Sequence, residues 1–203
     1  CKFITLMREI ELNQKNHLAV LREAVDVLNN GGVIIYPTET SYGLGANFLD
    51  KEATEKIYKI KKRDDKKALP VIVPDLMTAT TLVEFPQQAL GLANEHWPGP
   101  LTLVLPYRYC QASVCDDYLA LRVSSHPFVT ELLRNFGAAI ISTSANIAGS
   151  DNCYTVKDVR EQFKYAEFKP DLFINFGNLP INKPSTIIKI DENNHLEILR
   201  QGD

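Results

Sequence analysis

Short apolar runs that alternate with amphipathic segments are the feature that most constrains the fold of this chain. Runs of three to six residues rich in Val, Ile and Leu, bounded by turn residues, are typical of buried strands. They recur at residues 33–36, 70–73, 101–105, 119–123, 138–141, 172–174, 185–190 and 195–199. The interleaving of such strands with helices, without a repeat or a linker, predicts a single α/β domain over residues 1–203. Its sheet is expected to be open, twisted and mixed, with helices on its flanks.

Local signals set the ends of the predicted helices. Residues 16–29 have apolar positions at helical spacing and end at a Gly-Gly pair, which is a common helix stop. Asp50 is a suitable N-cap for a second helix, and residues 127–135 predict a third. Thr155 with Asp158 matches a capping box at the start of a fourth, which runs to about Phe163.

Composition restricts the class of function. The net charge is -3, so the chain as a whole has no electrostatic attraction to nucleic acid or anionic lipid, and any basic site must be local. Apolar runs are far shorter than the ~20 residues of a membrane span, and no signal-peptide pattern opens the chain. The four cysteines and four histidines are scattered, without zinc-ligand spacing. We therefore expect a cytoplasmic protein with reduced thiols, no membrane association and no metal held by its own side chains.

Two separated segments predict a binding site for a polyanion. Lys61 and Arg63 stand at the end of the second predicted helix, while residues 142–146, Ser-Thr-Ser-Ala-Asn, follow an apolar strand. Cations that face hydroxyl and amide groups at a strand end suit a nucleotide phosphate. Lys61 lies on the inward stripe of its helix, so it either extends to solvent or meets an anion at the edge of the core. The two interpretations of Lys61 are equally supported.

Two further features point to ligand binding. Residues 37–45, Pro-Thr-Glu-Thr-Ser-Tyr-Gly-Leu-Gly, have the hydroxyls and glycines of a ligand-facing loop, although a plain turn explains them as well. Arg122 interrupts an apolar strand and requires an anionic partner, which we expect to be a carboxylate, including that of a substrate. No P-loop, Ser-His-Asp order, activated cysteine or paired carboxylates stand out. Catalysis by positioning and charge neutralisation, as in phosphoryl or nucleotidyl transfer, is the remaining expectation.

Taken together, these blocks resemble the YrdC family of threonylcarbamoyl-AMP synthases, from about residue 18 to the end. The blocks that carry the resemblance are residues 36–45, 61–63, 97–102, 121–123, 126–127, 142–146 and 199–202. The length is similar to that of the short bacterial TsaC type. The resemblance implies an open twisted sheet with a large, concave, basic cavity. It also implies synthesis of threonylcarbamoyl-adenylate from L-threonine, bicarbonate and ATP, with Mg2+ and with release of pyrophosphate.

The resemblance also assigns residues. The family's Lys-x-Arg and Ser-x-Asn signature, at the ATP site, falls on Lys61, Arg63, Ser144 and Asn146, with Lys61 and Arg63 as the catalytic cations. Further ATP contacts fall on Lys67 and Arg200, and contacts to threonine fall on Thr38, Arg122 and Ser142. Lys62 and Asp64 replace a Gly and a Pro of many relatives, and Ile72 replaces a histidine of longer ones. The product would pass to downstream threonylcarbamoyl-transfer proteins that modify tRNA.

Alternatives from other classes stay open. A module that binds tRNA or double-stranded RNA could use the same basic cavity, but RNA recognition requires phosphate-spaced cations beyond this one cluster. Carbamoyl transfer from carbamoyl phosphate, as in the YrdC-like domain of hydrogenase maturation proteins, is a second enzymatic alternative. At Arg200 the choice is between a frayed tail and a strand that delivers the guanidinium to the cavity.

Overall fold

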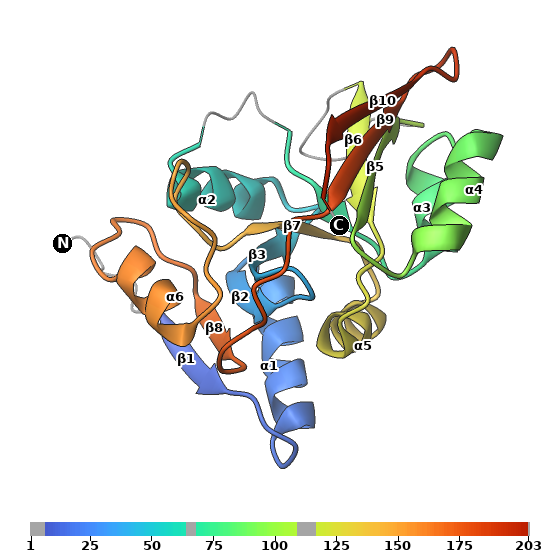
Figure 1. Cartoon of the computed structure of the whole chain (residues 1–203). Helices are drawn as coiled ribbons and strands as arrows, with labels where there is room; N and C mark the ends of the chain where they lie inside the picture. Colours follow the sequence, from blue (N-terminus) through green and yellow to red (C-terminus); the bar gives the residue numbers. More distant parts are fainter. Residues whose placement is uncertain (1–6, 64–67, 109–116, 203) are drawn as a thin grey trace.

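A ten-stranded mixed sheet runs through the part of the chain that the computed structural model describes, residues 7–63, 68–108 and 117–202 (Figure 1). Its strands are β1 Arg8–Glu11, β2 Val33–Pro37, β3 Tyr42–Asn47, β4 Val71–Ile72, β5 Leu101–Pro106, β6 Tyr118–Arg122, β7 Ile140–Ser144, β8 Leu172–Asn175, β9 Thr186–Ile190 and β10 Leu196–Arg200. They lie in the order β1-β8-β2-β3-β7-β4-β6-β5-β9-β10. Strand β8 is parallel to β1 and β2, whereas β3 is antiparallel to β2 and β7. The predicted α/β class is confirmed.

Helices cover the two faces of the sheet unequally. The helices of the described chain are α1 His17–Asn29, α2 Lys51–Lys61, α3 Leu76–Leu82, α4 Gln87–His96, α5 Pro127–Phe136 and α6 Val156–Phe163. Apolar residues of α1 and α5 form one cluster with Ile34, Tyr36 and Ile140. Residues of α2, α3, α4 and α6 belong to a second cluster, which includes the alternate strand positions Ile35 and Ile141. Among the described residues, no helix is long and apolar enough to cross a bilayer.

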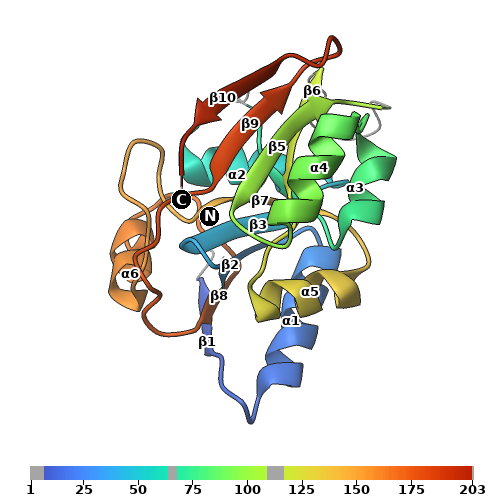
Figure 2. The same cartoon turned by 45° about the vertical axis from the view of Figure 1, so that its right-hand side comes forward.

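Helices α1 and α5 cover only one part of their face of the sheet, and the rest of that face is open. Strand register places Ile140, Ile72 and Arg122 side by side on this face. Ile72 and Ile140 still pack in the cluster with α1 and α5, but Arg122 lines a cavity instead. Helices α1 and α5 lie together beneath the sheet in both views, away from the β9–β10 hairpin (Figures 1 and 2). The uncovered half, formed by β6, β5, β9 and β10, becomes the floor of that cavity.

Most predicted elements form at or near the predicted positions. Asp50 caps α2 by accepting a hydrogen bond from Ala53 N at 3.0 Å, and the Thr155–Asp158 capping box is present at α6. The interpretation of residues 37–45 as only a loop is wrong, because they contain most of β3 as well as the turn that precedes it. The prediction that the 138–141 strand ends before Ser142 is also wrong. Strand β7 continues to Ser144, and its last residues pair with Gly43 and Gly45 of β3.

Candidate functional site

A cavity of about 780 Å³ occupies the open half of the sheet face. Among the described residues that line it are the cations Arg63, Arg122, Lys189 and Arg200 and one carboxylate, Asp117. These residues come from the α2–β4 connection, from β6, β9 and β10, and from the segment before β6. The excess of positive charge at one concave surface suits a ligand with several negative charges.

Arg63 enters the cavity directly after α2. Lys62, the C-cap, has the left-handed φ of 50°, and the amide of Arg63 donates to Tyr58 O at 3.1 Å, which turns the chain sharply. The guanidinium donates from Nη2 to Ala68 O at 2.9 Å. Arg63 is therefore held at the start of the segment that carries Lys67, and Lys67 itself lies outside the described residues.

Lys61 lies in the protein interior and not at the rim of the cavity. Its side chain points inward and is buried, with 3% relative exposure, and it is not among the residues that line the cavity. Nζ donates to Ser144 O at 2.6 Å, Asn146 O at 2.9 Å and Asn146 Oδ1 at 3.0 Å. Burial, and after it the charge of Arg63, lowers the pKa of Lys61 to about 8. The ammonium thus meets carbonyl oxygens rather than an anion, and it fixes the end of β7.

Ser144 and Asn146 form the wall that Lys61 supports. Ser144 Oγ donates to Asn146 Oδ1 at 2.6 Å, and the Asn146 side-chain amide donates to Ser150 O. Ser144 lines the cavity, whereas Asn146 is buried behind it. The structure therefore joins Lys61, Ser144 and Asn146 in one network, with Arg63 nearby on the cavity side.

Arg122 has the carboxylate partner that its buried position requires, and that partner belongs to the protein. Nη1 of Arg122 lies 2.8 Å from Oε1 of Glu39, and both side chains are largely buried. Ser124 Oγ donates to the other oxygen, Oε2, at 2.5 Å. Within the described parts of the chain this is the one ion pair of Arg122, so further guanidinium donors are open to a ligand in the cavity that Arg122 lines.

Ser142 is oriented by a buried tyrosine. Tyr36 OH donates to Ser142 Oγ at 2.6 Å, so the Ser142 proton remains available to a ligand in the cavity. Burial raises the pKa of Tyr36, which keeps this hydroxyl a donor. The ring of Tyr36 lies against β3, where a Cβ at Gly45 would be 2.7 Å from Tyr36 Cε1 and one at Gly43 would be 3.2 Å from Tyr36 Cζ. The Gly-x-Gly spacing of β3 therefore makes room for this ring.

Thr38 lines the cavity but also organises the turn between β2 and β3. Its hydroxyl donates to Ser41 O at 2.6 Å and accepts from the amides of Thr40 and Ser41, each at 3.2 Å. These bonds fix the turn that carries Glu39.

Arg200 is held in place rather than frayed. It closes β10, and its guanidinium donates to Ser185 O at 2.9 Å and to Ser185 Oγ at 3.0 Å. The hydroxyls of Ser185 and Thr102 lie 2.8 Å apart beneath it. Gly202 N donates to Thr186 Oγ1 at 3.0 Å, and a Cβ at Gly202 would be only 2.2 Å from Pro184 O. The strand interpretation of this segment is confirmed, and Arg200 lines the cavity.

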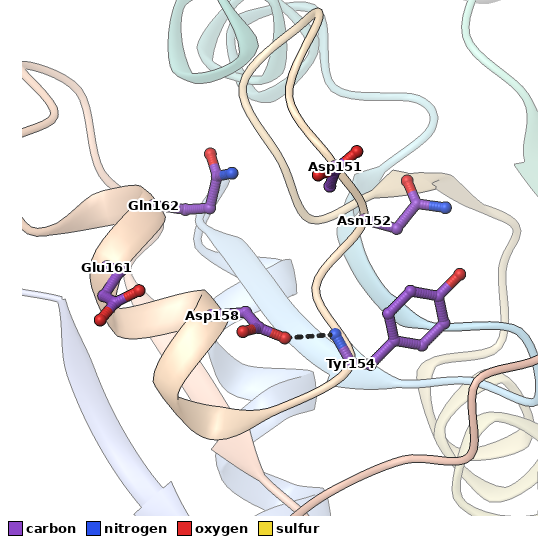
Figure 3. Close-up of a pocket in the computed structure, with 6 residues that line it drawn as sticks. All are labelled: Asp151, Asn152, Tyr154, Asp158, Glu161 and Gln162. Atoms are coloured by element: carbon purple, nitrogen blue, oxygen red, sulfur yellow. Dashed lines mark hydrogen bonds between the residues drawn. The ribbon is translucent and has the colours of Figure 1, made fainter.

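A second hollow of about 820 Å³ adjoins the first through Asn152 (Figure 3). Its lining residues are Asp151, Asn152, Tyr154, Asp158, Glu161 and Gln162. Asp158 accepts from the amides of Tyr154 and Thr155 and is thereby committed to the cap of α6. Three carboxylates disfavour a polyanion here, so phosphate groups fit the first cavity and not this one.

Sequence reasoning missed several residues that shape the site, above all Glu39, Tyr36 and Ser185. A signal for Glu39 existed, because an arginine within an apolar strand predicts a buried carboxylate partner somewhere in the chain. No comparable signal marks Ser185, since its role depends on the packing of β10 against the start of β9.

Comparison with known proteins finds relatives that match nearly the whole chain. The model of the Sua5/YciO/YrdC family, described as "Telomere recombination", matches residues 26–202. A Vibrio vulnificus protein named threonylcarbamoyl-AMP synthase is 33% identical over 188 residues, which is 90% of this chain and 98% of that protein. E. coli YciO superposes with a TM-score of 0.83 at 25% identity and covers 98% of this chain and 96% of its own.

P. abyssi Sua5, solved in complex with L-threonine, superposes with a TM-score of 0.84 at 30% identity. The match covers 98% of this chain and 58% of the P. abyssi chain. The family match extends over strands β2 to β10, so it includes every described residue of the basic cavity. The chain therefore belongs to the Sua5/YciO/YrdC family.

Proposed function

We propose that this protein joins L-threonine, bicarbonate and ATP into L-threonylcarbamoyladenylate and releases pyrophosphate. The observation that carries the proposal is the cavity, which combines cations suited to phosphates with an arginine and a serine suited to an amino acid. The name of the Vibrio vulnificus relative and the L-threonine complex of P. abyssi Sua5 support the same reaction. We infer that the product serves N6-threonylcarbamoyl modification of tRNA through downstream transfer proteins in the cytoplasm.

In this proposal the ATP phosphates contact Arg63 and Arg200, which both line the cavity. A guanidinium suits two-point contact with phosphate oxygens, and Ser144 adds a hydroxyl beside them. Lys67 belongs to the same group by its position in the sequence. Lys61 and Asn146 act from behind the wall, because their polar atoms already hold the backbone of residues 144–146. Lys61 contacts a phosphate directly only if it gives up one of these carbonyl partners.

Mg2+ enters this scheme as part of the nucleotide. The described residues provide no group of three or more His, Cys, Asp or Glu side chains that could hold a metal, and Asp117 is the one carboxylate among the lining residues. Mg2+ commonly binds through substrate phosphates with few protein ligands, which fits such a cavity. When bound it would offset negative charge on the phosphates.

Threonine occupies the centre of the cavity. Its carboxylate pairs with guanidinium donors of Arg122 other than the Nη that meets Glu39, and Ser142 donates its remaining proton to the substrate. Thr38 lies at the same wall, where its hydroxyl is shared with the turn. Such contacts place the amine without supplying a covalent catalyst.

The chemistry proceeds in two balanced steps. Bicarbonate takes up a proton and loses water to give CO2, and the neutral amine of threonine then attacks the CO2 carbon and releases a proton to give a carbamate. A carbamate oxygen then attacks the α-phosphorus of ATP, and the bond to the β-phosphate oxygen breaks to release pyrophosphate. Arg63 and Arg200 stabilise the charge that moves onto the leaving phosphates, an effect that is strongest in a site with little water.

The RNA-binding alternative has weaker support. Its cations would need to follow the phosphate spacing of a helix, whereas the described ones converge on one cavity. The net charge of -3 also disfavours general attraction to RNA.

Pyrophosphate release tests the proposal. We expect release from ATP only when L-threonine and bicarbonate are both present, because the nucleophile is made from both. Omission of either should reduce the rate to background. Release at an undiminished rate without threonine would show a simple ATPase and refute the proposal. Discrimination against serine should be modest, because one methyl group is worth ~1–3 kcal/mol in an apolar pocket.

A further inference from the structure

We propose that Glu39 is a positioning residue that aims Arg122 at the α-carboxylate of the amino-acid substrate. This inference rests on the proposed function and adds to it a requirement for a free carboxylate, recognised by a guanidinium that the protein itself holds from behind. Glu39 has no role in the assignments that the family signature supplies. It stands out only through the contacts that its side chain makes.

Three contacts hold Glu39 in one place. Its Oε1 lies 2.8 Å from Arg122 Nη1, and its Oε2 accepts from Ser124 Oγ at 2.5 Å. Its backbone oxygen accepts from the side-chain amide of Asn182 at 2.8 Å. The amide of His126 donates to the Ser124 hydroxyl at 3.2 Å, so that hydroxyl is directed at the carboxylate. Oε2 is thus hydrogen-bonded, whereas the buried Oε1 has the charge contact with Arg122 but no hydrogen bond of good geometry.

Glu39 acts on the ligand through Arg122 rather than directly. Arg122 is among the residues that line the cavity, whereas Glu39 is not. Its Oε1 is buried, so a ligand in the cavity cannot reach that oxygen without displacing the guanidinium. The carboxylate side chain is 16% exposed and that of Arg122 is 10% exposed, which places the pair at the base of the cavity. Because Arg122 lines the cavity and Glu39 does not, a ligand there meets the guanidinium and not the carboxylate.

This arrangement has a physical consequence for binding. An unpaired guanidinium at the base of a cavity is costly, and it would turn toward any available acceptor. The charge contact with Glu39 offsets that cost and favours one orientation of the guanidinium before the substrate arrives. A ligand carboxylate then completes the coordination of Arg122. A neutral amide at the same place lacks the charge that the guanidinium favours.

Glu39→Gln tests the inference, since the side chain keeps its shape and loses its charge. We expect the KM for threonine to rise about ten- to a hundredfold, as for the loss of one charged hydrogen-bonding arrangement, while the KM for ATP changes by less than about twofold. We also expect the advantage of L-threonine over L-threoninamide, measured as competing ligands, to shrink. Ser124→Ala should give a smaller increase in the same direction.

Two controls separate positioning from general damage. Glu9 forms an ion pair with Arg160 on the surface, with contacts of 3.0 and 2.7 Å, so Glu9→Gln should leave both KM values unchanged. In an Arg122→Ala background, Glu39→Gln should not raise the KM for threonine further, because Glu39 acts only through Arg122. Multiplying effects in the double variant would instead assign Glu39 a direct ligand contact and overturn the inference.

The outcomes remain distinguishable from those of the proposed function. If the parent protein releases pyrophosphate with threonine but Glu39→Gln has an unchanged KM for threonine, the positioning role fails and the proposed function stands. If the parent neither binds threonine in calorimetry nor releases pyrophosphate, both fail. Should Glu39→Gln not fold, as judged by its thermal midpoint, Ser124→Ala keeps both charges and decides the matter alone.

Discussion

The buried ammonium of Lys61 should make the stability of this protein depend on pH in a measurable way. Burial lowers the pKa of Lys61 from an ordinary 10.5 to about 8. Between these values the unfolded chain holds a proton that the folded protein has released, so stability rises with pH in this window. The cost of the buried charge is fully present below pH 8 and is lost as pH approaches 10.5.

The magnitude follows from the two pKa values. From pH 7 to pH 9 the linkage relation gives a gain of roughly 1.3 kcal/mol in the free energy of unfolding from this one group. Lys61→Met removes the titrating amine while it keeps an unbranched apolar stem at a buried position. From pH 7 to pH 9 the free energy of unfolding of the parent should therefore rise by that amount relative to the free energy of unfolding of the variant. Urea unfolding at several pH values measures it.

A matched control lies on the same helix. Lys56 is exposed and donates to Gly31 O at 2.8 Å, so Lys56→Met should give a profile parallel to that of the parent. Cys153 is buried with a raised pKa and opposes the effect near pH 9, but it is present in every variant. Parallel profiles for parent and Lys61→Met would refute the reasoning. They would mean that the three oxygen acceptors of Lys61 offset its desolvation completely.

Three further substitutions test the cavity. Arg200→Ala should weaken ATP binding about ten- to a hundredfold in calorimetry with little change in the thermal midpoint, and equal affinities would remove this arginine from the ATP site. Gly202→Ala should weaken ATP binding similarly, because its Cβ would be 2.2 Å from Pro184 O and would shift the end of β10; an unchanged affinity would contradict this. Gly45→Ala should lower the free energy of unfolding by about 1–3 kcal/mol through collision with the Tyr36 ring, and a neutral result in urea unfolding would show that the ring can move.

The sequence predicted those elements whose signals are local. Helices α1, α2, α5 and α6 have apolar spacing and recognisable ends, and the apolar strands follow from their composition. Strand β3 was not predicted, because its glycines are typical of a loop. Tyr42, Leu44 and Ala46 nevertheless follow the two-residue period of a strand. Helices α3 and α4 and strand β1 were not predicted. In α4, for example, only Ala89 and Ala93 are buried, which is a weak apolar signal.

The sequence indicated which residues belong to the candidate site better than it indicated which contacts they make. Residue types indicated a polyanion site at residues 61–63 and 142–146, and the family resemblance added Arg200. Arg63, Ser144 and Arg200 all line the same cavity. The burial of Lys61 could not be derived, because a lysine on an inward stripe can also extend to solvent. The partner of Arg122 was correctly expected to be a carboxylate. Its identity required knowing that the turn after β2 reaches the end of β6.

The sheet order has a consequence for how the chain is made. Strand β2 is buried along its whole length, and one of its two neighbours is β8, which begins at Leu172. A ribosome adds about 5–20 residues per second, so the roughly 135 residues between these strands take some 7–27 s to synthesise. Throughout that interval one edge of an apolar strand has no native partner. The nascent protein should therefore depend on chaperones or on slow, cool expression until its final third emerges, and the cavity is assembled last.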